Sequence, residues 1–320
     1  MSKLRTLQQA IVHFSSSDNC MNYMIERRWP NGVHCPTCGS GEVRLISTRR
    51  MWECKNKHPR KQFSVKVGTI FEDSALPLDK WLIAVWMITN CKNGVSSYEV
   101  ARALGITQKS AWFMLHRIRL AMQNRTFIKL GGKGKEVEVD ETFIGGLARN
   151  MHPERHYRRI TATKGKDKTV VIGMLERGGE VRANVTPTRR RHHVTAQVRT
   201  NVARESMIYT DALQSYDNLK NENFAHQMID HAERYVDGRV HTNGLENFWS
   251  LLKRGLKGTY IAVEPFHLFR YLDEQVFRYN FRKLPNDGAR FEHVVNHLVG
   301  KRLTYADVTG KTTTTYGLPN

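Results

Sequence analysis

The segment EVEVDETFIGG at residues 136–146 constrains the fold most, because it has the pattern of a strand that ends at a defined point. Two valines alternate with Glu138 and Asp140, which is the two-residue period of a strand with one apolar face. A Gly-Gly pair then ends the pattern, as glycines do where a chain turns. The segment therefore predicts a strand that holds Asp140 on a rigid edge.

Two later carboxylates follow predicted elements of their own. Asp211 comes after the apolar run at residues 207–209, as at the end of a strand, and Glu246 lies near the start of a helical pattern at residues 243–254. If the three meet, they offer hard oxygen ligands, which suit Mg²⁺ or Mn²⁺ and not zinc. Simpler interpretations stay open, since Asp140 alone fits a solvent-facing residue and Glu246 fits a helix-capping residue.

Net charge narrows the class of partner. The chain has 320 residues, of which 40% are hydrophobic, which is enough for about two domains with buried cores. Lys and Arg number 50 against 30 Asp and Glu, a formal net charge of +20, and such a surplus favours a nucleic acid partner. No basic amphipathic helix, membrane-spanning run or hydrophobic signal core stands out, so we expect a cytoplasmic, nucleoid-associated protein with no membrane partner.

The cysteines favour a metal site over disulfides. Of five cysteines, three cluster as Cys35, Cys38 and Cys54, and His58 follows the last of them. A Cys-x-x-Cys turn, a short hairpin and a second ligand pair resemble a zinc ribbon with one structural Zn²⁺. The usual second Cys-x-x-Cys is absent, so the fourth ligand is His58 or the nearer His34. The alternative is three unlinked thiols in a reducing compartment.

The rest of the N-terminal part has a recognisable order of elements. The sequence predicts a helix at residues 6–14, a hairpin at 43–46 and 51–53, a strand at 63–71 and a helix to about residue 90 with Asp79 as its N-cap. A capping-box pattern at Ser96 and Glu99 begins a short helix, and Thr107 caps a longer one to about residue 123. This layout predicts a helix-turn-helix.

The second helix of that pair carries basic side chains. Helix pairs of this kind often serve only in packing, but the charge and the adjacent ribbon favour contact with DNA phosphates or base edges. The residues expected to make this contact are Lys109, His116, Arg117 and Arg119.

A glycine-rich linker at residues 130–135 separates a second part of the chain. Beyond it the pattern predicts strands at residues 136–144, 169–176, 180–186 and 207–210, a helix at about 195–204, a mixed segment at about 216–234 and the helix of Glu246. This order is that of an α/β, RNase H-like domain, in which the first and fourth strands lie side by side.

Other residues of this part have expected places. Glu138 shares the face of Asp140 and is expected in solvent or on a basic neighbour. His241 either contacts a phosphate or a metal-bound water at the acidic site or, as is more common for a lone histidine before a helix, is structural. The aromatic residues expected in the core are Phe248, Trp249, Phe277 and Tyr279.

Two basic segments flank the predicted carboxylates. They are the loop at residues 150–159 and the run Arg189, Arg190 and Arg191. Each is either a solvated face or a contact with DNA phosphates. Their place beside an acidic site favours contact with phosphates. The polar, Thr-rich residues 304–320 are expected to form a loose tail.

With these residues in view, the chain resembles the ISXO-like insertion-sequence transposases, a DDE-type family with an N-terminal zinc ribbon. The resemblance runs from about Cys35 to Arg282. It rests on the motifs QFSVKVGTIFEDS at 62–74, VDETFIGG at 139–146, YTDA at 209–212, HTN at 241–243 with Glu246 and Lys253-Arg254, and YLDEQVFRYN at 271–280.

The resemblance implies a catalytic triad of Asp140, Asp211 and Glu246 that binds two Mg²⁺ or Mn²⁺ ions, with Lys253 as an accompanying basic residue. Lys253 and Arg254 are then expected on DNA. The implied reaction frees 3′-OH groups at the inverted repeats of the element and joins them to target DNA. We expect double-stranded DNA as the partner and a homo-oligomer on it. Nuclease or resolvase activity, or DNA binding by a domesticated protein, are the alternatives.

The predicted domain ranges are an N-terminal helix and zinc ribbon at 1–75, a helix-turn-helix region at 76–130, an RNase H-like catalytic domain at 131–300 and a tail at 301–320.

Overall fold

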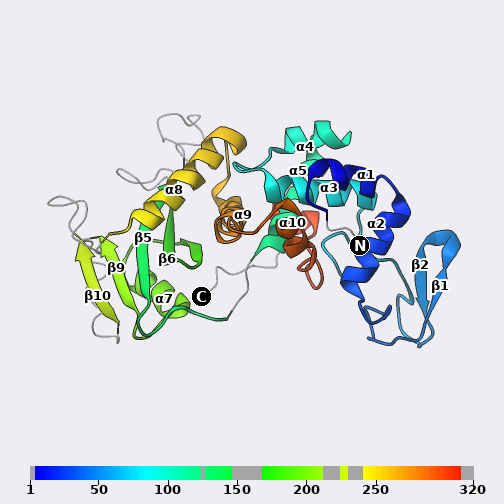
Figure 1. Ribbon diagram of the computed structural model, residues 1–320, viewed down its shortest axis with the longest axis horizontal. Coiled ribbons are helices and arrows are strands. Elements are labelled where there is room, and N and C mark those ends of the chain that lie inside the picture. Colours follow the sequence, from blue (N-terminus) through cyan, green and yellow to red (C-terminus); the bar gives the residue numbers. More distant parts are fainter. Residues whose placement is uncertain (1–3, 124–126, 146–167, 212–223, 230–240, 311–320) are drawn as a thin grey trace. The chain divides into compact units, whose positions relative to one another are not determined.

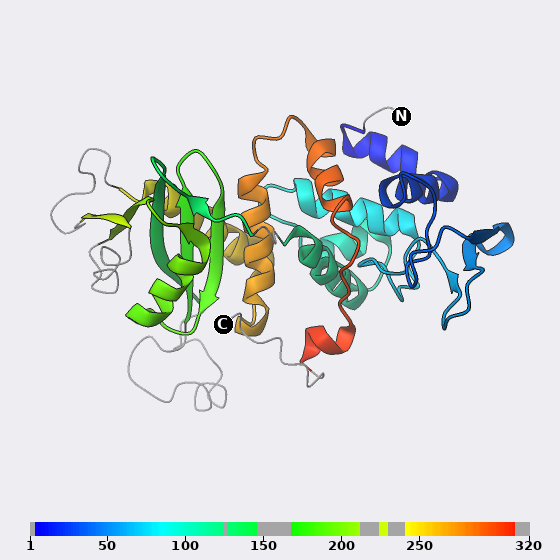
Figure 2. The same cartoon turned by 90° about the horizontal axis from the view of Figure 1, so that it is seen from below.

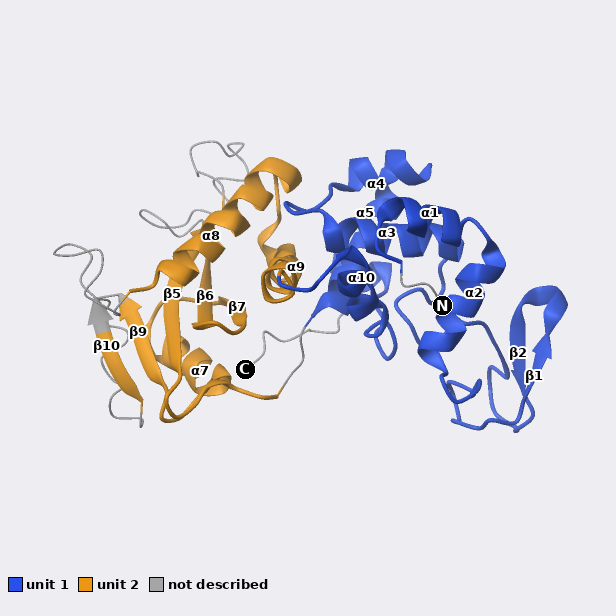
Figure 3. Cartoon of the chain, viewed as in Figure 1, with its two compact units in different colours: residues 1–123, 283–320 blue, residues 124–282 orange. Residues whose placement is uncertain are grey.

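The computed structural model describes residues 4–123, 127–145, 168–211, 224–229 and 241–310. The chain forms two compact units, one of residues 1–123 with 283–320 and one of residues 124–282 (Figure 3). The predicted boundary near residue 130 is close to the observed one. The predicted ranges 131–300 and 301–320 differ from it, because the residues from Lys283 onward pack with the N-terminal part.

Helices are the main regular elements of the first unit (Figure 1). They are α1 (Leu7–Phe14), α2 (Ser17–Arg28), α3 (Leu78–Asn90), α4 (Ser97–Leu104), α5 (Gln108–Met122), α10 (Asp287–Val295) and α11 (Tyr305–Thr309). The capping boxes explain where several begin: the Ser96 hydroxyl accepts from the Glu99 N–H and the Glu99 carboxylate accepts from the Ser96 N–H, as predicted. The predicted cap of α3 is wrong, since Pro77 and not Asp79 is its N-cap.

A small antiparallel sheet completes the first unit. Its strands are β1 (Val43–Ile46), β2 (Met51–Cys54) and β3 (Gln62–Phe63), in that order, with a 3₁₀ turn η1 (Ser47–Arg49) between the first two. The predicted hairpin is confirmed. The predicted strand at 63–71 is wrong beyond Phe63, because Val67 and Thr69 donate their N–H groups to the carbonyls of Ser64 and Lys66 in local turns.

The C-terminal segment is ordered where it was expected to be loose. Thr304 and Asp307 form a capping box that begins α11, and Val308 is buried. Leu303 and Val308 pack against Leu120 of α5 in one apolar cluster. The remainder of the predicted tail, residues 311–320, lies outside the described residues.

A five-stranded sheet organises the second unit. Its strands are β5 (Glu136–Ile144), β6 (Thr169–Glu176), β7 (Val181–Thr186), β9 (Met207–Asp211) and β10 (Ala225–Ile229), in the spatial order β10-β9-β5-β6-β7. The pairs β5–β6 and β6–β7 are antiparallel, whereas β9 is parallel to both β5 and β10. The first and fourth predicted strands are therefore neighbours, as expected. A separate parallel pair joins β4 (Leu130–Gly131), inside the predicted linker, to β8 (Val202–Ala203).

Helices cover both faces of the sheet (Figures 1 and 2). On one face Val137 and Val139 pack with Val194 and Val198 of α7 (Arg191–Asn201). The opposite face meets α8 (Asn243–Gly255) and α9 (Leu268–Asn280), through a cluster that includes Phe248, Trp249, Leu252 and Tyr279. Phe277 is also buried, so the four aromatic residues predicted to be core are confirmed as such. The predicted helix at 195–204 begins four residues earlier than expected.

The turn after α8 is held against α9. It consists of a π-helical turn η5 (Leu256–Tyr260), then a 3₁₀ turn η6 (Pro265–His267). The Tyr260 hydroxyl donates to Glu274, a fully buried residue of α9 that also pairs with Arg278 one turn later. Asn280 then binds the Val181 backbone at both its N–H and its C=O, at 2.8 and 3.0 Å. These contacts fix α9 to β7 and explain the polar residues of the 271–280 motif. Within the described ranges, no helix has the length and apolar character needed to cross a membrane.

Candidate active site and metal centre

Asp140 lies in the middle of the sheet, where β5 passes under α8. It is half-buried. Its Oδ2 accepts a hydrogen bond of 2.9 Å from the Trp249 indole N–H, and its Oδ1 accepts one of 2.8 Å from the Glu141 backbone N–H. The carboxylate is thus held in one orientation by the helix above it and by its own strand.

Asp211 is the last residue of the neighbouring strand β9. The parallel register pairs Glu136 with Met207 and Glu138 with Tyr209. Continued by two residues along both strands, the same register brings Asp140 level with Asp211. Neighbouring strands lie about 4.8 Å apart, so the backbones of the two residues are close. The side chain of Asp211 lies outside the described part of the structure.

Glu246 lies on the first turns of α8, and its side chain is exposed. Its carboxylate makes no hydrogen bond or ion pair with any residue that the structure describes. It does not cap the helix: Thr242 is the N-cap residue, and the free N–H of Leu245 in the first turn donates to the Glu138 carboxylate at 3.0 Å. Three residues after Glu246 comes Trp249, which contacts Asp140, and residues three apart lie on the same side of a helix. Glu246 therefore projects from the side of α8 that contacts Asp140.

Lys253 and Arg254 follow two turns later on the same helix. Lys253 is half-buried and Arg254 is exposed, and neither forms an ion pair within the described ranges. Lys253 is seven residues from Glu246, nearly two full turns, so the two share a side of α8. The predicted pairing of these two positions fits the helix geometry.

Glu138 was expected in solvent or on a basic neighbour, and the structure corrects the first alternative. Its side chain is 2% exposed and its Oε1 accepts from the Arg177 Nε at 2.9 Å. Arg177 also donates through Nη2 to the His241 carbonyl at 2.7 Å. Sequence patterns missed Arg177, which lies just after β6 in a turn with no distinctive motif. His241 takes part in this network through its ring, 3.1 Å from the same Arg177 nitrogen.

Two glycines permit the close approach of α8 to the sheet. A Cβ at Gly173 on β6 would lie 2.6 and 2.8 Å from two indole carbons of Trp249, and a Cβ at Gly244 would lie 2.7 Å from a Glu138 oxygen. Real Cβ contacts are longer than this. Any larger residue at either position would push the helix away from Asp140 or Glu138.

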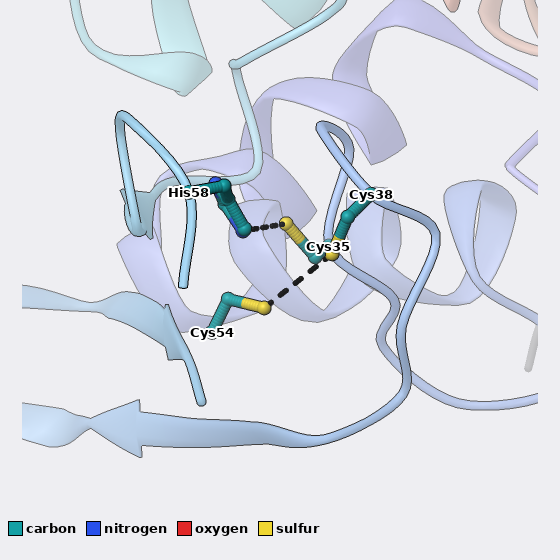
Figure 4. A group of neighbouring side chains, drawn as sticks. All are labelled: Cys35, Cys38, Cys54 and His58. Carbon is teal, nitrogen blue, oxygen red and sulfur yellow. Dashed lines mark hydrogen bonds between the residues drawn. The ribbon is translucent and has the colours of Figure 1, made fainter. Parts of the chain in front are cut away.

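The second candidate site lies in the small antiparallel sheet of the first unit (Figure 4). The ligand atoms of Cys35, Cys38, Cys54 and His58 all lie within 4.8 Å of one another. The Cys35 Sγ is 3.4 Å from the His58 Nε2, and the Cys38 Sγ is 3.6 Å from the Cys54 Sγ. A Zn–S bond of about 2.3 Å in a tetrahedron requires ligand separations of about 3.8 Å, so these four side chains fit zinc.

The histidine of this cluster is already oriented for a metal. The His58 Nδ1 is 2.7 Å from the Pro59 carbonyl, a contact that directs Nε2 toward the cysteines. His34 is exposed and its Nδ1 lies 2.6 Å from the Gly32 carbonyl. Of the two histidines left open by the sequence, the structure places His58 with the thiols.

The thiols differ in acidity. Although burial opposes ionisation of Cys35, the backbone N–H groups of Cys38 and Thr37 lower its pKa to about 7. Burial raises the pKa of Cys54, and the neighbouring thiols Cys38 and Cys35 add to that rise. A divalent cation would favour the thiolate at every position.

The predicted DNA-contacting face of α5 is mostly wrong. His116, Arg117 and Arg119 are 1%, 4% and 1% exposed. Arg117 donates to the Leu303 carbonyl at 3.1 Å and to the carbonyl of Glu72. These side chains are inside the first unit, and sequence alone could not show that the C-terminal segment covers them. Lys109 is exposed, with its Nζ 4.9 Å from the Tyr305 ring centroid.

The other predicted DNA-contacting arginines are accessible. Arg189, Arg190 and Arg191 are all exposed at the start of α7, of which Arg190 is the N-cap. The guanidinium of Arg189 lies over the Phe143 ring, 5.8 Å from its centroid. The predicted basic loop at residues 150–159 lies outside the described residues.

Comparisons with known proteins match both parts of the chain to transposase families. A family model described as an ISXO2-like transposase domain matches residues 129–280, and one described as a transposase zinc-ribbon domain matches residues 15–56. An uncharacterized protein in transposable element ISH50 of Halobacterium salinarum is 29% identical over 267 residues, which are 77% of this chain and 85% of that protein. An uncharacterized transposase-like protein of Haemophilus influenzae is 34% identical over 83 residues, 26% of this chain and 67% of that protein.

Among solved structures, the crystal structure of a pre-cleavage Mos1 transpososome aligns with 94% of this chain and 100% of that chain, at 10% identity and a TM-score of 0.27. The two family models cover Asp140, Asp211, Glu246 and the three clustered cysteines, while His58 lies two residues beyond the zinc-ribbon match, and one relative matched over 85% of its length comes from a transposable element. This chain belongs to the ISXO2-like family of insertion-sequence transposases, with its zinc-ribbon domain in the first unit and its transposase domain in the second.

Proposed function

We propose that the protein is a DDE-type DNA transposase in which Asp140, Asp211 and Glu246 form the catalytic triad. The observation that supports this proposal is the parallel register of β5 and β9, whose last pair, Glu138 and Tyr209, comes two residues before Asp140 and Asp211 on the sheet that the helix of Glu246 covers. Along the chain, three antiparallel strands (β5, β6 and β7) come before two parallel ones (β9 and β10). Their spatial order, β10-β9-β5-β6-β7, is also the order expected of an RNase H-like domain.

The donor set suits Mg²⁺ or Mn²⁺. Asp140 and Glu246 offer carboxylate oxygens, and Glu246 makes no competing contact among the described residues. Hard oxygen ligands of this kind are those that both ions prefer. A pair of such ions, when bound, would activate the attacking oxygen and stabilise the leaving 3′ oxygen of a phosphodiester.

The protein's own residues would orient the DNA and the carboxylates. The Trp249 N–H fixes one oxygen of Asp140 and leaves the carboxylate less freedom to rotate. Lys253, on the same side of α8 as Glu246, is placed to bind a backbone phosphate next to the reacting one. The exposed Arg189, Arg190 and Arg191 would neutralise further phosphates, with a binding affinity that falls as salt rises.

The first unit would contribute a structural zinc ion, held by Cys35, Cys38, Cys54 and His58. With its net charge of +20 the chain is suited to double-stranded DNA, namely the inverted repeats at the ends of its element and the target. Joining two element ends to one target calls for more than one subunit, so we infer a homo-oligomer on DNA.

The test is strand transfer with purified protein, Mg²⁺ or Mn²⁺, and labelled DNA carrying the inverted repeats that flank the gene. The wild type is expected to release 3′-OH ends and join them to a target plasmid. Asp140→Asn, Asp211→Asn and Glu246→Gln should each lower joining by at least about 1000-fold, as loss of an essential group does, while end binding persists. Glu180→Gln is a matched control, because Glu180 is an acid of the turn between β6 and β7 that has no part in the proposed triad.

Two results would count against the proposal. Joining by the Asp140→Asn variant would remove the triad assignment. Cleavage without any joining by the wild type would indicate a nuclease on the same scaffold.

A further inference from the structure

Arg177 connects the sheet to the start of α8 through several hydrogen bonds at once. Its Nε donates to the Glu138 Oε1 at 2.9 Å, and its Nη2 donates to the His241 carbonyl at 2.7 Å. Its Nη1 is 3.5 Å from a Glu136 oxygen. Its guanidinium also stacks on the Tyr209 ring, 4.2 Å from the centroid. One side chain thus contacts β5, β9 and His241, which lies two residues before α8.

The second half of this connection is Glu138. While its Oε1 accepts from Arg177, its Oε2 accepts from the Leu245 N–H in the first turn of α8, at 3.0 Å. A carboxylate at a helix N-terminus also interacts favourably with the helix dipole. Gly244 allows this approach, since a Cβ there would lie 2.7 Å from the same oxygen. The carboxylate fixes a backbone group of the helix, not a flexible side chain.

The residue next to Leu245 is Glu246. Because Glu138 binds the Leu245 N–H, its position determines where the first turn of α8 stands over β5, and Glu138 is only two residues from Asp140 on that strand. Arg177 in turn fixes the Glu138 carboxylate. The chain of contacts therefore runs from Arg177 through Glu138 and Leu245 to the carboxylate proposed as the third member of the triad.

We propose that Arg177 is a positioning residue that, with Glu138, sets the distance between Glu246 and Asp140 and thereby the affinity of the triad for its divalent ions. This inference rests on the proposed function. Glu138 is itself an acid beside Asp140, but its side chain is 2% exposed, whereas Asp140 is only half-buried, and its charge is already balanced by Arg177 at 2.9 Å. It is a support for the metal site and not a ligand of it.

The test is a Mn²⁺ titration of the full-length, zinc-loaded protein without DNA, with free Mn²⁺ followed by electron paramagnetic resonance. Loss of a residue that orients metal ligands typically weakens metal binding about 10- to 100-fold. Arg177→Met should raise the Mn²⁺ dissociation constant by that factor and shift the Mn²⁺ midpoint of strand transfer equally. The rate at saturating Mn²⁺ should recover in large part, and end binding should stay within about twofold.

Arg182→Met is the matched control. Arg182 is also a half-buried arginine of the second unit, on β7. It donates to the Ile128 carbonyl and, at 3.4 Å, to the Asn201 side chain, and these partners are not part of α8. Its loss should lower stability without moving the Mn²⁺ midpoint. If Arg177→Met fails to fold, Glu138→Gln gives the same information, because it keeps the size of the side chain and removes the charge that holds Arg177.

The outcomes separate the inference from the proposed function. Asp140→Asn should abolish Mn²⁺ binding by the second unit. If the wild type and this variant bind the same amount of Mn²⁺, the triad assignment fails. If the wild type binds Mn²⁺ through Asp140 but Arg177→Met binds it equally well, or if Arg182→Met shifts the midpoint as much, only the positioning role of Arg177 is overturned.

Discussion

Replacing Gly173 with alanine should separate α8 from the strand that carries Asp140. The new methyl group would lie 2.6 and 2.8 Å from two carbons of the Trp249 ring and 2.9 Å from a Leu245 methyl group. Overpacking of this kind costs about 1–3 kcal/mol. If the indole shifts, its hydrogen bond to the Asp140 carboxylate is also lost, which adds about 1 kcal/mol. The expected loss of local stability is therefore about 2–4 kcal/mol.

Hydrogen exchange followed by mass spectrometry would measure this effect on the full chain. Peptides from β5, β6 and α8 should lose protection by roughly 30- to 700-fold, the factor that corresponds to 2–4 kcal/mol. Gly258→Ala is the control, because a Cβ there meets no atom within 4 Å. In a helical turn that change should be neutral or stabilising by up to about 1 kcal/mol.

A double mutant isolates the contact that matters. Trp249→Phe removes the part of the ring that a Cβ at Gly173 would strike, so in that background Gly173→Ala should cost clearly less, because only the Leu245 methyl group at 2.9 Å remains in the way. Equal costs of Gly173→Ala in both backgrounds, or full protection in the single mutant, would refute the claim that the indole rests on this glycine.

Three further predictions concern the first unit. Cys54→Ser should reduce bound zinc from about one ion per chain to near zero in a metal analysis, and full zinc content would remove the Cys₃His site. Arg117→Met should lower the free energy of unfolding by about 1–3 kcal/mol, because the carbonyls of Glu72 and Leu303 lose their donor. The salt dependence of DNA binding should stay unchanged, and a smaller slope of affinity against salt would show that Arg117 contacts phosphate. Burial, with His297 and Lys301 nearby, lowers the pKa of His293 to about 4, so the unfolded chain binds a proton there that the folded chain does not. Stability should thus be constant above pH ~6.5 and fall as the pH drops from there to 4, and His293→Gln should flatten this dependence in denaturation curves.

Local signals in the sequence were sufficient for the elements of both sites. The alternation around Asp140 predicted β5, the Ser96 and Glu99 pair predicted the start of α4, and the cysteine spacing predicted the cluster that includes Cys35. Each of these signals lies within a few residues of the structure that it specifies. Family motifs then supplied the assignment of the triad, which remains a prediction.

What the sequence missed depends on residues far apart in the chain. Arg117 was predicted to contact DNA because its true partners could not be recognised. They are the backbone carbonyls of Glu72 and Leu303, and every residue has such a carbonyl, so no residue type indicates them. The choice for Glu138 between solvent and a basic neighbour stayed open because its partner Arg177 follows a different strand. Strand periodicity at 63–71 was outweighed by local turns that end in an isolated bridge between Thr69 and Val299.

The discontinuity of the first unit has a consequence for how the protein is made. Arg117 and the Leu303 carbonyl that it binds are 186 residues apart. At typical rates of protein synthesis, roughly 10–40 s pass on the ribosome between the appearance of one and the other. During that time the apolar side of α5 that Leu303 and Val308 later cover is open to chaperones and proteases. A message that ends early, before Lys283, would yield a polypeptide whose N-terminal unit can never be completed.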